Sequence, residues 1–124
     1  MVNSSSQFVG VFGYSYGITI KNVVLDSSCS IENSYKGPDW SYVGGIIGDC
    51  RDCTIENIVN MGSVSFTGAV TGSIYNFLYI GGIAGNISAS SIARNCANYG
   101  PVTDYGTSKY TFIGGVLGLS AGAS

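Results

Sequence analysis

The sequence of 124 residues contains no histidine. Histidine is the commonest general base in enzymes and the commonest protein ligand of transition metals. Its absence excludes serine–histidine–aspartate and cysteine–histidine catalysis in their usual forms. Charged residues are also scarce, at 10% of the chain. Ser, Thr, Asn and Tyr must therefore form the polar surface, which is common in secreted proteins.

The few charges and the short apolar runs restrict the possible partners. The net charge is −2 and the five basic residues are scattered, so no basic stripe follows a phosphate backbone and we expect no nucleic acid partner. No apolar run approaches the ~18 residues that span a bilayer, and the polar start does not resemble a signal peptide. We expect no membrane span, and any export signal would lie outside this chain.

Paired carboxylates leave one catalytic alternative. Asp49 with Asp52, or Glu32 with Glu56, would be the acids of a glycosidase. A β-helical glycosidase needs many more coils than this length allows for a substrate cleft. We therefore expect a protein that is not an enzyme and needs no cofactor.

A glycine box recurs along the chain. It appears as YVGGIIG at 42–48, YIGGIAG at 79–85 and FIGGVLG at 112–118, with a shortened FVGVFG at 8–13. The steps from Val9 to Val43, Ile80 and Ile113 are 34, 37 and 33 residues. Such periods indicate a repeat architecture. The boxes lack the lysine and the helix of a phosphate loop, so tight packing between coils is the favoured reason for their glycines.

Two further segments follow each box. The first is TIKN at 19–22, TIEN at 54–57 and SIARN at 91–95, the last with one extra residue. The second is NMGSV at 60–64 and NYGPV at 98–102, whose Asn and Gly are expected to supply the left-handed conformations of a tight turn. Each repeat is interpreted as three short β segments.

These patterns predict an all-β, parallel β-solenoid of about three to four coils with a repeat of 33–37 residues. One domain, 1–124, would contain repeats at approximately 8–41, 42–78 and 79–111 and a partial repeat at 112–124. A β-sandwich is the alternative, but it does not explain the period. Ile20, Ile55 and Ile92 would form one core column beside that of Val43, Ile80 and Ile113. The residues expected to point inward are Val43, Ile46, Ile55, Val64, Ile80, Ile83, Ile92, Val102 and Ile113.

Two ladders of side chains are expected on the outside, because strand alternation turns neighbours to opposite faces. The aromatic ladder would consist of Phe8, Tyr42, Tyr79 and Phe112, which would bind sugar rings, dock a flat surface, lie under a loop or simply stack on one another. The charge ladder would consist of Lys21, Glu56 and Arg94, whose alternating signs would fix the register of the coils.

The cysteines and the glycosylation sequons give weaker signals. Cys50 and Cys53 form a CxxC motif, whereas Cys29 and Cys96 are isolated, so a zinc site is disfavoured and we expect no metal. Two disulfides of undetermined pairing are the favoured alternative, although Cys96 also fits a buried apolar position. Asn3 and Asn86 begin sequons and are candidate glycosylation sites in a eukaryotic host.

The repeats resemble the GLUG motif repeat of bacterial immunoglobulin A peptidases and large surface proteins. The resemblance covers nearly the whole chain and rests on GIIG at 45–48, GIAG at 82–85 and GVLG at 115–118, with NIVNMGSV at 57–64 and NCANYGPV at 95–102. Ile or Val replaces the leucine that gives the motif its name. The resemblance implies an extracellular, non-catalytic β-solenoid region, and it carries no catalytic residues over to this chain.

The sequence thus favours a structural or adhesive module at the cell surface or outside the cell. The last box lacks the segments that would complete its coil, and an open solenoid end exposes unpaired strand edges. We expect these edges to be covered either by adjoining repeats of a larger surface protein or by copies of the chain stacked head-to-tail into a filament. The alternative is a carbohydrate-binding module that holds glycans on Phe8, Tyr42, Tyr79 and Phe112.

Overall fold

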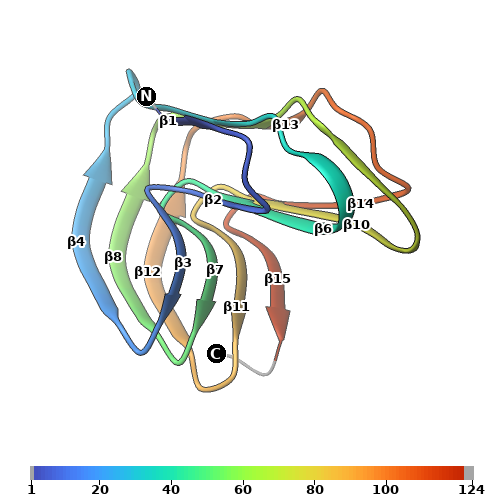
Figure 1. The fold of residues 1–124 in the computed structure, drawn as a ribbon. Coiled ribbons are helices and arrows are strands. Elements are labelled where there is room, and N and C mark those ends of the chain that lie inside the picture. Colours follow the sequence, from blue (N-terminus) through green and yellow to red (C-terminus); the bar gives the residue numbers. More distant parts are fainter. Residues whose placement is uncertain (1, 122–124) are drawn as a thin grey trace.

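The computed structural model describes residues 2–121, except for the side chains of residues 73–75. All regular elements in this part are β-strands, and neighbouring strands pair in parallel. The chain winds through three complete coils of four strands each and then through three strands of a fourth coil (Figure 1). The predicted parallel β-solenoid is confirmed.

Each coil adds one strand to each of four sheets, except that the fourth coil adds none to sheet D in the described residues. Sheet A contains β1 (Val2–Ser4), β5 (Ser30–Asn33), β9 (Ser63–Phe66) and β13 (Val102–Asp104). Sheet B contains β2 (Phe8–Val9), β6 (Lys36–Gly44), β10 (Ala69–Gly81) and β14 (Tyr110–Gly114). Sheet C contains β3 (Phe12–Tyr16), β7 (Ile47–Arg51), β11 (Ala84–Ser88) and β15 (Leu117–Ala121). Sheet D contains β4 (Thr19–Leu25), β8 (Thr54–Asn60) and β12 (Ile92–Asn98).

The four sheets enclose two apolar cores. Sheets C and D face each other around one core, and sheet A lies over sheet B around the other (Figure 1). Six residues predicted to point inward are at most 1% exposed, namely Val43, Ile46, Ile55, Val64, Ile80 and Ile83. The predicted column of Val9, Val43, Ile80 and Ile113 is in register across sheet B. In the last coil Val102 is half-buried and Ile113 is 52% exposed, because no further coil covers them.

The prediction of three β segments per repeat is wrong, because each complete coil has four. The glycine box does not form one strand: it bends sharply between Gly44 and Ile47, so its first half lies in sheet B and its second half in sheet C. We call this bend and its equivalents in the other coils the elbow. A Cβ atom on Gly85 would lie 2.6 Å from the backbone nitrogen of Val43, so sheets B and C approach there more closely than any side chain permits.

The inward position predicted for Ile92 is also wrong. Ile92 is 37% exposed and pairs with Thr54, while Ala93 takes the place opposite Ile55. The pairing offset grows from 37 residues at Arg51 and Ser88 to 38 at Thr54 and Ile92. The extra residue of this repeat therefore lies in the turn before Ile92, and not between Ile92 and Asn95.

The left-handed residues differ from those predicted at the Asn-x-Gly turns. Positive φ angles occur instead at the asparagines three residues earlier in each coil, at 61° in Asn22, 55° in Asn57 and 51° in Asn95. Gly100 is a glycine because a Cβ atom there would collide with the carbonyl oxygen of Gly62 in the coil below. These glycines serve close stacking of coils and not a left-handed turn.

Candidate functional site

The predicted aromatic ladder lies on the outer face of sheet B. The register places Phe8 opposite Tyr42, Tyr42 opposite Tyr79 and Tyr79 opposite Phe112. Successive ring centroids are 5.7, 5.2 and 5.2 Å apart with interplanar angles of 13–25°. These are the distances of offset-stacked rings, so the four side chains stabilise one another across the coils.

A second aromatic row runs beside the ladder and was missed by the sequence reasoning. Trp40, Phe77 and Tyr110 each stand two residues before a ladder ring, and they are in register with one another. Residues two apart on a strand share a face. The recurrence of an aromatic residue two positions before Tyr42, Tyr79 and Phe112 was therefore the signal that would have revealed the row.

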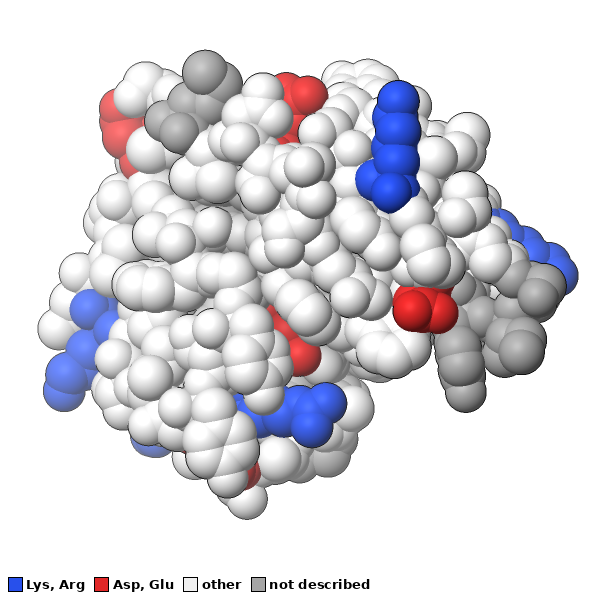
Figure 2. All heavy atoms as spheres, in the orientation of Figure 1, with Lys and Arg blue, Asp and Glu red and all other residues white. Residues whose placement is uncertain are grey.

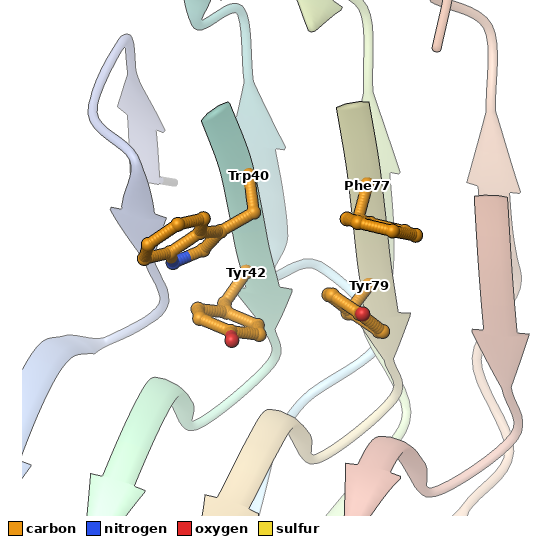
Figure 3. A pocket seen from close by; sticks show the side chains of 4 residues that line it. All are labelled: Trp40, Tyr42, Phe77 and Tyr79. Atoms are coloured by element: carbon orange, nitrogen blue, oxygen red, sulfur yellow. The ribbon is translucent and has the colours of Figure 1, made fainter. Parts of the chain in front are cut away.

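The two rows enclose a pocket of about 280 Å³ lined by Trp40, Tyr42, Phe77 and Tyr79. The rings of Tyr42 and Tyr79 lie side by side, whereas the rings of Trp40 and Phe77 point away from each other on the adjacent strands β6 and β10 (Figure 3). Phe77 is drawn toward the last coil, with its centroid 5.4 Å from that of Tyr110. The pocket lies where the second row opens, between coils two and three.

A buried carboxylate lies next to the ladder. Asp49 on sheet C is 2% exposed and accepts a 2.8 Å hydrogen bond from the Asn86 amide in the next coil. Burial raises the pKa of Asp49 above its ordinary value of 3.8, although the bond from Asn86 and the charge of Arg51 lower it. Burial also raises the pKa of the Tyr42 phenol to about 12, and the charge of Asp49 adds to this shift.

We expect Asp49→Asn to stabilise the protein at neutral pH by about 1 kcal/mol and to reduce the pH dependence of its stability. Because folding raises the pKa of Asp49, the native state holds more protons than the unfolded state between the unfolded pKa of 3.8 and the folded pKa. Stability is therefore lost as the pH rises through the folded pKa of this group. Denaturant unfolding of both proteins between about pH 3.5 and about pH 7.5 measures the difference. A constant gap between the two curves would contradict the prediction.

The predicted charge ladder is in register on sheet D, with Lys21 opposite Glu56 and Glu56 opposite Arg94. Arg94 Nε lies 3.8 Å from Glu56 Oε1, and both side chains are partly exposed. Beside them the Asn57 side-chain amide donates a 3.1 Å hydrogen bond to the side-chain oxygen of Asn22. Exposed ion pairs contribute little to stability, so this row would chiefly fix the register between coils.

The two candidate glycosylation sites differ in accessibility. Asn3 is exposed on β1. Asn86 is only 5% exposed, and its amide nitrogen donates to Asp49. Attachment of a glycan to the Asn86 amide nitrogen would break this hydrogen bond and would require the buried side chain to reach solvent. Asn86 therefore does not fit a glycosylation site.

The cysteines form one disulfide, between Cys50 and Cys53, while Cys29 and Cys96 are free thiols. The expected second disulfide is thus not formed. Cys96 is half-buried opposite Ile58, and burial raises the pKa of its thiol. Within residues 2–121, no group of three or more Cys, Asp or Glu side chains is arranged to hold a metal ion.

The carboxylates weighed as glycosidase acids each have a structural partner. Asp49 accepts from Asn86 and Asp52 accepts from the backbone of Ser90. Glu32, on sheet A, accepts from Thr67, while Glu56, on sheet D, pairs with Arg94. Glu32 and Glu56 lie on different sheets and do not face a common cleft.

The two ends of the solenoid are open in different degrees. Strands β13, β14 and β15 form one edge of sheets A, B and C, and β1, β2 and β3 form the other edge. At the last coil Phe112 is 46% and Ile113 is 52% exposed, and at the first coil Phe12 is 45% exposed. Apolar residues of the repeat are thus uncovered at both ends, but Val9, the first-coil member of the column of Ile113, is only 2% exposed.

Comparison with models of known protein families, with curated proteins and with solved structures finds no match. In the described part of the chain, none of the elements is a helix of the length and hydrophobicity needed to cross a membrane.

Proposed function

We propose that this chain is a non-catalytic structural module of an extracellular or cell-surface protein, and that its open coils stack on further coils. The observation that supports this most directly is the exposure of Ile113. It continues the column of Val43 and Ile80, which are fully buried, yet more than half of its own surface is uncovered. A further coil would bury this residue as Ile113 itself helps to bury Ile80.

The geometry favours a second copy of the chain as the covering element. If the register continues, Phe112, Ile113 and Leu117 of one copy face Phe8, Val9 and Phe12 of the next. These pairs are of the same kind as those inside the chain, where Tyr42 faces Phe8, Val43 faces Val9 and Ile47 faces Phe12. Such a head-to-tail contact is heterologous and does not close, so it produces a filament.

Low charge supports the same function. Charged side chains are sparse on the face of the molecule shown in Figure 2, so repulsion between copies is weak. The resemblance of the glycine boxes to GLUG repeats adds support for surface display, as a stalk, an adhesive region or a filament.

Cross-linking tests the stacking. In a chain without Cys29 and Cys96, cysteines at Phe8 and Phe112 are expected to form disulfides between copies and to give a ladder of oligomers under oxidising conditions. Within one copy the two positions lie three coils apart, about 14 Å. A disulfide allows at most about 7 Å between Cα atoms, so a bond inside one copy is excluded.

The matched control places the second cysteine at Tyr110, on the same face of β14 but two residues out of register. It should cross-link much less than the Phe112 variant. Equal yields from both pairs, together with a monodisperse monomer at every concentration in light scattering, would contradict head-to-tail assembly. Adjoining repeats of a larger protein would then be the covering coils.

Carbohydrate binding on the aromatic ladder is the second candidate function. It is favoured by the projection of seven rings from one face of sheet B. The mutual stacking of the ladder occupies ring surface that a sugar would need, which is why we rank it second. Its test is binding of neutral sugars, which should be lost in Tyr42→Ala.

A further inference from the structure

The pocket between the two aromatic rows is lined by four ring side chains and by no charged one. We propose that it binds a quaternary ammonium group, such as the trimethylammonium group of choline. Its volume of about 280 Å³ lies below the range of pockets for drug-sized ligands, so it suits one compact group. The inference does not depend on head-to-tail assembly of copies of the chain.

Cation–π attraction is the chemistry that recognises such a group. A cation within about 6 Å of a ring centroid is attracted to the ring face, most strongly by tryptophan, and several rings together form the aromatic cages that hold quaternary ammonium ligands. Trp40, Phe77 and the two tyrosines come from adjacent strands and surround one opening (Figure 3).

The same aromatic row already holds a cation within the chain. The Lys109 ammonium group lies 5.5 Å from the centroid of Tyr110. Tyr110 stacks on Phe77, so the Lys109 contact is one ring away from the pocket. This contact lies outside the pocket and places one cation against a ring of the same row.

Hydrogen bonding distinguishes this ligand from a sugar. The lining side chains offer two tyrosine hydroxyls and one indole N–H as polar groups. A pyranose ring would bring several hydroxyls that need partners, and any left unpaired would weaken binding. A quaternary ammonium group has no hydrogen-bond donor, so it can enter a pocket lined by rings without leaving a polar group unpaired.

The surrounding charge also favours a cation. The chain has a net charge of −2. Burial is the main cause of the raised pKa of Tyr42, on the wall of the pocket. Of the two nearby charges, Asp49 raises this pKa by more than Arg51 lowers it. Of these two charges, the negative one therefore acts more strongly at this wall of the pocket.

Intrinsic fluorescence provides a direct test, because Trp40 is the single tryptophan of the chain. Titration with choline should change the emission and saturate with a dissociation constant on the order of 1 mM. The neutral isostere 3,3-dimethyl-1-butanol has the same shape without the charge and should bind at least about tenfold more weakly. Phosphatidylcholine vesicles are tested separately. Binding of free choline without binding of the vesicles would assign the site to small molecules and not to lipid headgroups.

Two variants that retain Trp40 locate the site. Phe77→Leu keeps an apolar side chain but removes a ring, and it should weaken choline binding by about fivefold or more. Tyr99→Leu removes a ring that is 77% exposed in the turn after sheet D, and it should leave binding unchanged. Unfolding curves of both variants verify that each is folded.

Three results would overturn the proposal. Equal binding of choline and its neutral isostere would show a merely apolar pocket. Saturable binding of glucose or mannose without choline would assign the face to carbohydrates. No change in emission up to about 50 mM choline, far above the expected constant, would show that the rings hold no ligand of this class.

Discussion

Gly82→Ala is expected to lower the free energy of unfolding by about 3 kcal/mol. A Cβ atom at Gly82 would collide with the carbonyl oxygen of Gly115 in the next coil and with the side chain of Asn98. Since one obstacle is backbone, the coils would have to separate locally. Chemical denaturation followed by circular dichroism measures the loss.

Gly115→Ala is the matched control, because Gly115 occupies the same place in the box one coil later. A Cβ atom there meets nothing within 4 Å, and Gly115 does not require the left-handed conformation. We expect this variant to be as stable as the parent protein at low concentration. In a head-to-tail stack, however, the new methyl group would meet the next copy, so the variant should also fail to assemble. Equal destabilisation by Gly82→Ala and Gly115→Ala would show that stacking does not explain the repeated glycines of the box.

The stacking of coils explains which parts of the fold were predictable. Equivalent residues of a repeat must lie over one another, so the spacing of Val9, Val43, Ile80 and Ile113 was enough to predict their register. Repetition also placed the rings of the aromatic ladder and the charges of Lys21 and Glu56 in rows.

The features that the sequence did not reveal depend on where a residue is inserted or where the chain bends. One extra residue before Ile92 turns Ile92 outward and Ala93 inward. The sequence does not show on which side of Ile92 the extra residue lies, because the distance from the preceding strand to Asn95 is the same in both cases. The elbow was hidden because glycine permits both a straight strand and a bend, and only the contact between sheets B and C selects the bend.

The pocket shows a different limit. The aromatic residues of both rows were visible in the sequence, and alternation would have placed Trp40 and Phe77 beside Tyr42 and Tyr79. The divergence of the Trp40 and Phe77 rings was not predictable. Pro38 and Asp39 are adjacent in β6, but their partners in β10, Thr71 and Asn76, are separated by four additional residues. This insertion interrupts the register between Thr71 and Asn76, one residue before Phe77.

Asn60→Leu is expected to lower the free energy of unfolding by about 3 kcal/mol, because it removes three hydrogen bonds at a buried position. The Asn60 amide nitrogen donates to the backbone carbonyl oxygen of Gly82 and to the side-chain oxygen of Asn98, each at 3.0 Å. Its side-chain oxygen accepts from the backbone of Gly62 at 2.9 Å. Leucine has as many side-chain heavy atoms as asparagine but leaves the Gly82 carbonyl and the Gly62 N–H without this partner, so the cost reflects polar groups and not a cavity.

The reverse substitution one coil earlier separates this effect from packing. Leu25 pairs with Asn60 at the same position of the first coil. Leu25→Asn exchanges the same two side chains but adds an amide that can join the ladder of Asn60 and Asn98, so it should cost less than Asn60→Leu. Denaturant unfolding of both variants decides the comparison. If Leu25→Asn were the more damaging change, apolar packing against sheet C would matter more at this position than the amide ladder. The hydrogen bonds of Asn60 would then not be the main link between the elbow and the Asn-x-Gly turn of the neighbouring coil.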